Sequence, residues 1–314
     1  MKIGFIFAGQ GNQYQGMGQD LYEKYPLVKD YFNKANMILG YDLYNICLNN
    51  PDNKLNDTIY TQPALVTLDH CLYKLLEINN IKPHIIAGLS LGEYNALCAS
   101  DVITFEDMIN IIKQRALIMS NAFKKDSTGM AAILKANPHE VEQLLKDNFN
   151  NEVAICNYNT DDQVVIGGYK DCLNDAISFL KERGYKRIIP LQVSVVSHMN
   201  LLNKASDLLK EELEKYHFNI PKYLFINNIN ATFQVDNFVP SLARQISCPT
   251  KMAQTIKLML ENDIDTFIEI GPKKTISSFI KSIASKQDKE IKIFNVYDDK
   301  TLLETINEIG DING

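Results

Sequence analysis

The residues with the clearest chemical potential are Ser90 and the two glycines around it. Residues 88–92 read Gly-Leu-Ser-Leu-Gly, after a strand-like run at 83–87 and before a helix-compatible stretch at 93–98. This strand–turn–helix context is required of a nucleophile elbow, in which glycines permit a cramped turn that exposes the serine hydroxyl. The backbone N–H of Leu91 would then face a developing oxyanion. The alternative is a tight turn with a capping serine, because bare matches to this pattern also arise by chance.

A serine hydroxyl is a poor nucleophile until a base accepts its proton, and five histidines are available. Four of them lie in segments that favour a structural or solvated role: His70, His84, His139 and His217. His198 instead follows the last strand of a predicted subdomain. A histidine at such a junction can project into the cleft between domains, where sites tend to form. Spacing alone makes His198 only the best of the five.

Two more segments are candidates for ligand binding. Residues 7–13 read Phe-Ala-Gly-Gln-Gly-Asn-Gln after a strand, and the glycines around Gln10 suit a close approach of backbone to ligand. A dinucleotide motif fails here, because Tyr14 stands where its third glycine belongs. The alternative is a plain glycine-rich connection. Arg115 lies among apolar residues of a helical pattern, where it either snorkels to water, the commoner case, or pairs bidentately with a carboxylate.

Short β-rich runs alternate with longer amphipathic helices through most of the chain, which predicts a mainly parallel sheet covered on both faces. We expect strands at residues 3–7, 84–87, 266–270 and 291–296, and helices at 62–77, 105–123, 201–216, 241–260 and 274–285.

The middle of the chain predicts a different arrangement. Strands are expected at 130–134, 153–158, 163–166 and 186–193, with helices at 138–145 and 171–183. This β-α-β-β-α-β order is the ferredoxin-like arrangement. We therefore predict a large α/β domain made of residues 1–126 and 196–314, interrupted by a ferredoxin-like subdomain at 127–195.

Bulk properties exclude several classes of protein. The chain has 314 residues and a formal net charge of -6, which disfavours a broad nucleic-acid-binding surface. Its six cysteines form no C-x-x-C pair, so a zinc or redox site is not expected. No apolar run approaches the roughly 20 residues that span a bilayer. We expect a cytoplasmic monomer with reduced thiols and no metal.

Taken together, the segments resemble malonyl-CoA:acyl-carrier-protein transacylases and the related acyltransferase domains of polyketide synthases. The resemblance covers essentially the whole chain, and its motifs occur in the family's order. They lie at residues 7–13, 61–65, 88–93, 114–115 with Met119, 129–132, 157–159, 163–168, 197–198, 242–245 with Pro249, and 268–272.

The resemblance implies a role for each matching position. Ser90 would be the acylated nucleophile and His198 its general base. The backbone N–H groups of Gln10 and Leu91 would form the oxyanion hole. Arg115 would bind the free carboxylate of the malonyl group, and the main-chain carbonyl of Gln245 would orient the histidine. Three further positions would line the substrate cleft: Gln62, Met119 and Asn159.

The implied activity is transfer of malonyl from malonyl-CoA to the phosphopantetheine thiol of holo-acyl carrier protein in fatty-acid biosynthesis, on an α/β-hydrolase-like fold without a bound cofactor. Two alternatives share the motifs: a standalone trans-acting acyltransferase of a polyketide synthase and, less favoured, an acyl thioesterase. The chain departs from many relatives at Leu89, at Ser197, and at Lys251 and Met252 after the proline.

Overall fold

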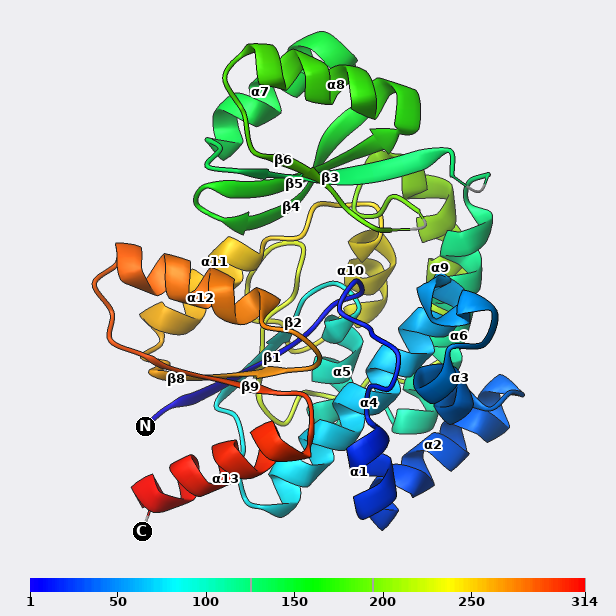
Figure 1. The fold of residues 1–314 in the computed structure, drawn as a ribbon, viewed down its shortest axis with the longest axis vertical. Helices are drawn as coiled ribbons and strands as arrows, with labels where there is room; N and C mark the ends of the chain where they lie inside the picture. The colour runs from blue at the N-terminus through cyan, green and yellow to red at the C-terminus, as the bar shows by residue number, and fades with distance from the viewer. Residues whose placement is uncertain (125, 194, 314) are drawn as a thin grey trace.

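A five-stranded parallel sheet forms the centre of the larger part of the molecule (Figure 1). The computed structural model describes residues 1–124, 126–193 and 195–313. The strands lie in the order β7-β2-β1-β8-β9, and every neighbouring pair is parallel. Their bounds are β1 (Ile3–Phe7), β2 (Ile85–Gly88), β7 (Leu224–Phe225), β8 (Thr266–Ile270) and β9 (Lys292–Val296). The strands β1, β2 and β8 are buried along their whole length, as parallel strands covered on both faces must be.

Helices cover both faces of this sheet. Phe5 and Phe7 pack into the cluster that includes α4, α5 and α6, whereas Ile6 between them packs against α11 and α12 on the opposite face. The helices of this part are α1 (Gln19–Lys24), α2 (Pro26–Leu39), α3 (Leu43–Asn49), η1 (Pro51–Asn56), α4 (Thr58–Ile78), α5 (Gly92–Ala99), α6 (Phe105–Asn121), η2 (Asn200–Leu202), α9 (Asn203–Leu213), α10 (Phe238–Gln245), α11 (Met252–Glu261), α12 (Thr275–Lys286) and α13 (Asp299–Asn313).

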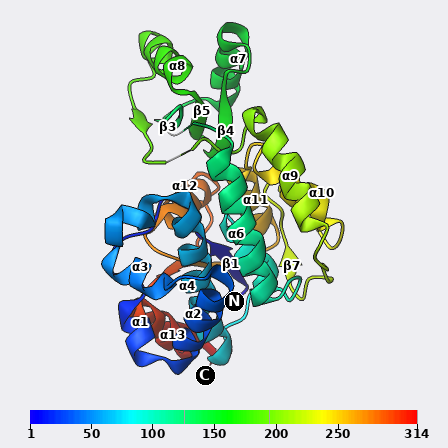
Figure 2. The same cartoon turned by 90° about the vertical axis from the view of Figure 1, so that its right-hand side faces the viewer.

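The second sheet has four antiparallel strands in the order β4-β5-β3-β6, and α7 and α8 cover it (Figure 2). Its elements are β3 (Thr128–Leu134), α7 (Pro138–Phe149), β4 (Val153–Thr160), β5 (Gln163–Tyr169), α8 (Lys170–Glu182) and β6 (Ile188–Pro190). The order β-α-β-β-α-β and the ferredoxin-like arrangement are as predicted. These elements fall within the predicted insert at 127–195, and its exact boundaries stay a prediction. Ser194, within that range, lies outside the described residues.

Strand β4 joins the small sheet to the larger part. Tyr158 donates its N–H to the carbonyl of Thr250 at 2.9 Å, and Thr250 donates in turn to the carbonyl of Cys156 at 3.0 Å. Beyond this bridge, the turn after β4 forms two ion pairs with the large domain, Lys257–Asp161 and, at 3.1 Å, Lys286–Asp162. The two sheets are therefore held together from the side of α11 and α12.

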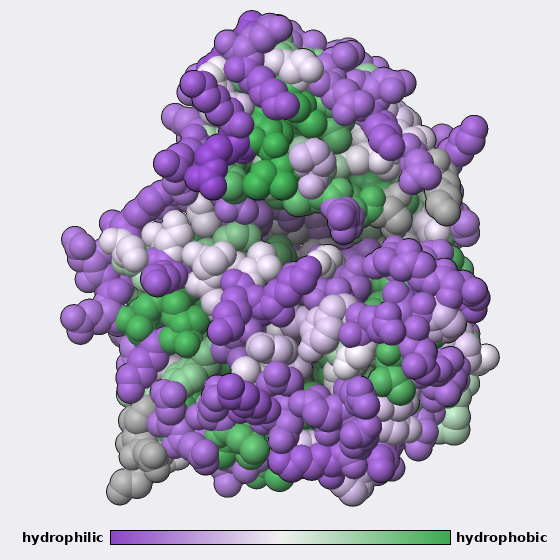
Figure 3. Space-filling model, viewed as in Figure 1, coloured by the Kyte–Doolittle hydropathy of each residue, from purple (hydrophilic) through white to green (hydrophobic). Residues whose placement is uncertain are grey.

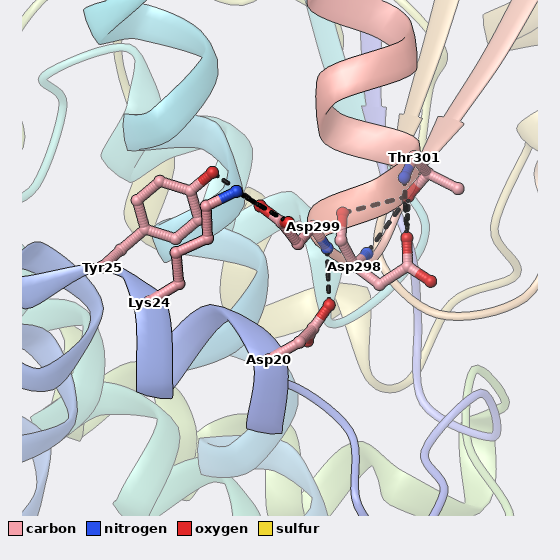
Figure 4. A network of polar contacts seen from close by, with 6 residues as sticks. All are labelled: Asp20, Lys24, Tyr25, Asp298, Asp299 and Thr301. Atoms are coloured by element: carbon pink, nitrogen blue, oxygen red, sulfur yellow. Dashed lines mark hydrogen bonds and ion pairs between the residues drawn. The ribbon is translucent and has the colours of Figure 1, made fainter.

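A polar cluster ties the last helix to the first (Figure 4). Asp299, at the start of α13, accepts hydrogen bonds from Lys24 at 2.8 Å and from the hydroxyl of Tyr25 at 2.6 Å. Its own N–H donates to Asp20 at 2.7 Å. Both ends of the chain lie on the side of the molecule away from the small sheet (Figure 1). In the described chain, no helix is both long and apolar enough for a membrane span.

The predicted helix over 241–260 is wrong. The chain leaves the helix after Gln245 and re-enters one at Met252. Pro249 has no N–H to continue the helical hydrogen bonds, and Thr250 makes its backbone bonds to the small sheet instead. The strand predicted over 186–193 is also shorter, since only 188–190 pair with β3.

Candidate active site

The turn between β2 and α5 holds Ser90 in a conformation that most residues avoid. Its φ is 54°, in the left-handed region, which is the strained geometry of a nucleophile elbow. Glycine is required beside it, because a Cβ on Gly92 would lie 2.4 Å from the carbonyl oxygen of Phe7. A Cβ on Gly88 would lie 2.0 Å from the carbonyl carbon of Gly92. The flanking glycines thus let α5 start directly against β1.

Asn228 holds this turn in place through two hydrogen bonds, and no sequence motif indicates this role. Its Oδ1 accepts the N–H of Ser90 at 2.6 Å, and its Nδ2 donates to the carbonyl of Gly88 at 2.5 Å. Asn228 follows β7 and is 1% exposed. An asparagine in a loop 138 residues from its partner carries no spacing signal that sequence inspection could use.

His198 lies against the Ser90 hydroxyl. Its Nε2 is 2.7 Å from Ser90 Oγ, and its Nδ1 is 2.7 Å from the main-chain carbonyl oxygen of Gln245. A carbonyl can only accept, so the proton sits on Nδ1 and Nε2 is free to accept the serine proton. Burial lowers the pKa of His198 to about 4, so the ring is neutral near pH 7. This is the state that a general base needs.

The break between α10 and α11 places the groups that hold the histidine. Gln245 ends α10, and its carbonyl points at the ring, while the carbonyl of Ile246 accepts the N–H of His198 at 2.7 Å. Had the predicted helix continued, both carbonyls would have been used within it. The break between α10 and α11 therefore leaves both carbonyls free to hold His198 in place.

Arg115 of α6 is buried, at 1% exposure, so the snorkelling alternative is wrong. Its Nη1 donates to Gln62 Oε1 at 2.6 Å, and its Nη2 donates to Gln245 Oε1 at 3.1 Å. Nη2 also lies 3.4 Å from Ser90 Oγ. No carboxylate among the described residues lies within ion-pair distance of this guanidinium. A buried cation without a counter-ion beside a nucleophile can bind an anionic group of a substrate.

The cleft that contains these groups has a volume of about 440 Å³ and runs between the two sheets. Figure 3 shows a hollow in this region, below the part of the molecule that carries the small sheet. The predicted site residues that line it are Gln10, Ser90, Leu91, Arg115, Met119, Asn159 and His198. Gln62 is not among the lining residues; it lies behind Arg115, fully buried, with its amide donating to Thr58 at 2.9 Å.

The two predicted oxyanion donors, the N–H groups of Gln10 and Leu91, lie on adjacent loops near the N-terminus of α5. Gly9 packs against the carbonyl of Leu89, so closely that a Cβ there would lie 2.8 Å from that oxygen. This contact brings the Gln10 loop against the elbow. Over the described part of the chain, the N–H groups of Gln10 and Leu91 donate to no other protein group. Both remain available for a ligand oxygen.

A carboxylate lies beneath the elbow. Glu93, on the first turn of α5, accepts the N–H of Asn228 at 2.8 Å and the side-chain amide of Gln245 at 2.5 Å. It is 3% exposed, and burial raises its pKa to about 7. Both of its oxygens accept from N–H donors, which is the bonding of the ionised form. Glu93 belongs to a motif shared with the family, but no pattern around it indicates a function.

A serine next to a neutral histidine, two free backbone donors and a buried arginine together define a serine-nucleophile enzyme suited to acyl groups that carry a negative charge. Comparison with known proteins agrees with this class. Residues 4–296 match the family model described as the acyl transferase domain.

The chain is 34% identical over 286 residues to the malonyl CoA-acyl carrier protein transacylase of Escherichia coli, covering 90% of this chain and 93% of that protein. It is 34% identical to the polyketide biosynthesis malonyl CoA-acyl carrier protein transacylase of Bacillus subtilis, covering 92% and 98%. The crystal structure of malonyl CoA-acyl carrier protein transacylase from Clostridium perfringens superposes with a TM-score of 0.93 at 35% identity, covering 100% and 98%. The chain therefore belongs to the acyl transferase family that includes these transacylases, as the resemblance of its motifs predicted.

Proposed function

We propose that this protein transfers the malonyl group from malonyl-CoA to the phosphopantetheine thiol of an acyl carrier protein, through a malonyl ester on Ser90. The observation that carries the proposal is that the imidazole of His198 and the guanidinium of Arg115 both lie close to the Ser90 hydroxyl. His198 Nε2 lies 2.7 Å and Arg115 Nη2 3.4 Å from Ser90 Oγ. A base and an anion-binding cation therefore act on the same acyl group.

In the first half of the proposed reaction, His198 takes the proton of Ser90 as the oxygen attacks the thioester carbonyl. The N–H groups of Gln10 and Leu91 stabilise the oxyanion, a contribution that typically amounts to about 3 to 4 kcal/mol per donor. The carbonyl of Gln245 holds the imidazole and stabilises its protonated form. The tetrahedral intermediate collapses, the C–S bond breaks, and coenzyme A leaves as a thiol with the proton from His198.

In the second half, His198 accepts the proton of the carrier's phosphopantetheine thiol. The thiolate attacks the malonyl ester through the same oxyanion hole, and the proton returns to Ser90 as the C–O bond breaks. Because one acyl group leaves before the second thiol arrives, the kinetics are ping-pong.

Arg115 supplies the selection for malonyl in this proposal. A malonyl carboxylate completes the hydrogen bonding of a guanidinium that already holds Gln62 and Gln245. An acetyl group offers no such acceptor and leaves the buried cation without a counter-ion. Met119 and Asn159 line the space beside the acyl group, with Gln62 supporting Arg115 from behind.

The similarity to the Bacillus subtilis polyketide protein favours a second candidate, in which the acceptor is the carrier of a polyketide synthase. The chemistry is the same in both, and only the carrier differs. We propose the fatty-acid carrier as the main partner, with the enzyme acting in the cytoplasm as a monomer and without a bound cofactor or metal.

Intact mass spectrometry after mixing with malonyl-CoA tests the proposal. We expect a malonyl adduct on the wild type and none on Ser90→Ala. Holo-carrier protein should discharge the adduct, and fatty-acid and polyketide carriers compared at equal concentration identify the partner. An adduct that persists on Ser90→Ala would exclude Ser90 as the nucleophile, and one that water discharges as fast as a carrier would indicate a thioesterase.

A further inference from the structure

Gln245 is the point where the base and the anion-binding group of the site meet. Its main-chain carbonyl contacts His198 Nδ1 at 2.7 Å, while its side-chain Oε1 accepts from Arg115 Nη2 at 3.1 Å. A primary amide can be turned by 180° about its last bond, which exchanges its acceptor oxygen and its donor nitrogen. The direction in which this amide points therefore decides whether Arg115 meets an acceptor or a donor.

Glu93 fixes that direction. The amide nitrogen of Gln245 donates to Glu93 Oε2 at 2.5 Å and to the main-chain carbonyl of Ser90 at 2.8 Å. The carbonyl can only accept, and so can the ionised carboxylate of Glu93. Turning the amide would bring its oxygen against these two acceptors and its nitrogen against the guanidinium, which can only donate. Each of these contacts would leave a buried polar group unsatisfied, because Gln245 is fully buried.

Glu93 is itself held in one orientation. Its other oxygen accepts the N–H of Asn228 at 2.8 Å, the residue that fastens the Ser90 turn. A continuous set of hydrogen bonds thus leads from the elbow through Glu93 and Gln245 to Arg115. Burial raises the pKa of Glu93 and lowers that of Arg115, and the attraction between the two charges, which are not in contact, opposes both shifts.

We propose that Glu93 is a positioning residue for substrate selection: by fixing the amide of Gln245, it presents the guanidinium of Arg115 to the carboxylate of the acyl group. The inference rests on the proposed function of Arg115. Glu93 touches neither the substrate nor the reacting atoms, and it acts through Gln245.

Glu93→Gln is the informative substitution. It keeps the shape of the side chain but cannot accept from both donors, because one of its two ends is now an NH₂ group. Either the amide of Gln245 turns and offers its nitrogen to Arg115, or the new NH₂ group faces one of the two N–H donors that Glu93 bonds in the wild type. Glu93→Asp keeps an acceptor-only carboxylate and serves as the conservative variant.

The readout is the rate of Ser90 acylation by malonyl-CoA divided by the rate with acetyl-CoA, measured by rapid-quench mass spectrometry. For Glu93→Gln we expect this ratio to fall about tenfold, the size of one net buried hydrogen bond. The fall should come from malonyl-CoA, chiefly as a higher KM. Glu93→Asp should restore most of the ratio. A role in folding alone would lower both rates equally and leave the ratio unchanged, which would overturn the inference.

Glu269→Gln is the matched control. Glu269 is also a buried carboxylate that accepts from two N–H groups, those of Ile276 and Ser277 at the start of α12. Its loss should lower the melting temperature without changing the ratio of acylation rates. If Glu93→Gln gives no folded protein, Gln245→Met removes the same acceptor from Arg115 and should lower the ratio at least as much; an unchanged ratio there also refutes the inference.

The wild type separates this inference from the proposed function. A wild type that forms no malonyl–Ser90 adduct refutes both together. A wild type that acylates with a clear preference for malonyl, beside a Glu93→Gln variant with the same preference, refutes only the role of Glu93.

Discussion

Replacing Arg115 by alanine is the perturbation whose outcome depends most directly on the geometry of the site. The guanidinium is buried, bonded to Gln62 and Gln245, and lies 3.4 Å from Ser90 Oγ. Removing one partner of a buried, hydrogen-bonded charge pair typically costs about 2 to 5 kcal/mol. This corresponds to a loss of roughly 30- to 5,000-fold in kcat/KM for malonyl-CoA.

The same substitution also affects the folded state, so the rate with malonyl-CoA alone is not a sufficient measure. It leaves two amide oxygens without a donor, each at a cost of about 1 to 3 kcal/mol. It also opens a cavity beside Tyr94, whose ring lies 5.5 Å from the guanidinium. Acylation by acetyl-CoA in the same preparation corrects for both effects, because the acetyl group makes no contact that needs the cation.

The assay is therefore the ratio of kcat/KM for malonyl-CoA to that for acetyl-CoA, in wild type, Arg115→Ala and Arg115→Lys. We expect alanine to abolish most of the preference for malonyl and lysine to retain part of it, since an ammonium keeps the charge but not the planar fork. Arg183→Ala, at an exposed arginine directly after α8, should leave the ratio unchanged. Equal losses for both acyl groups in Arg115→Ala would refute the assignment and make Arg115 structural.

Three further predictions concern the elbow and the base. Asn228→Ala should lower the free energy of unfolding by about 2 to 4 kcal/mol and slow acylation, because two buried hydrogen bonds to the Ser90 turn are lost; a thermal melt close to that of the wild type would contradict this. Gly92→Ala should fail to fold or unfold far below the wild-type temperature, since its Cβ meets backbone at 2.4 Å, whereas Gly310→Ala, with open space around it, should be tolerated. His198 has a folded-state pKa of about 4, below its ordinary 6.5, so its stability contribution is complete above pH 6.5 and is lost as the pH falls through 4. The free energy of unfolding of wild type relative to His198→Asn should accordingly decrease by about 3 kcal/mol from pH 7 to pH 4, and a difference independent of pH would show that the ring is not buried in the neutral form.

The central strands could be predicted from the sequence because a strand buried on both faces leaves a run of mostly apolar residues within one short segment. β1 and β8 are short runs rich in Ile and Phe that end before glycine-containing turns, and each prediction matches the structure residue for residue. The break between α10 and α11 was missed because the apolar periodicity continues across it, although Pro249 is a local signal against a single helix. The pairing of Thr250 with β4 leaves no such signal, because it is a contact between segments about 90 residues apart.

The same distinction holds for the site. The glycines around Ser90 made it a candidate nucleophile, whereas Arg115 stayed between snorkelling and anion binding until the family resemblance implied a role for it. Asn228 and Glu93 gave no such signal, because a polar group in a hydrogen-bonded network is defined by partners elsewhere in the fold. They bond to each other across 135 residues. Sequence patterns indicate which groups can react, whereas the groups that orient them emerge only once the chain has folded.

The position of β1 has a consequence for how the protein is made. Its two neighbours are β2, reached early in synthesis, and β8, which begins at Thr266. Until the ribosome has passed that point, one edge of β1 has no partner, and this strand of apolar residues can pair with other chains. The sheet can thus close only after β8 has been synthesised, and a nascent chain truncated before residue 266 should aggregate or need a chaperone.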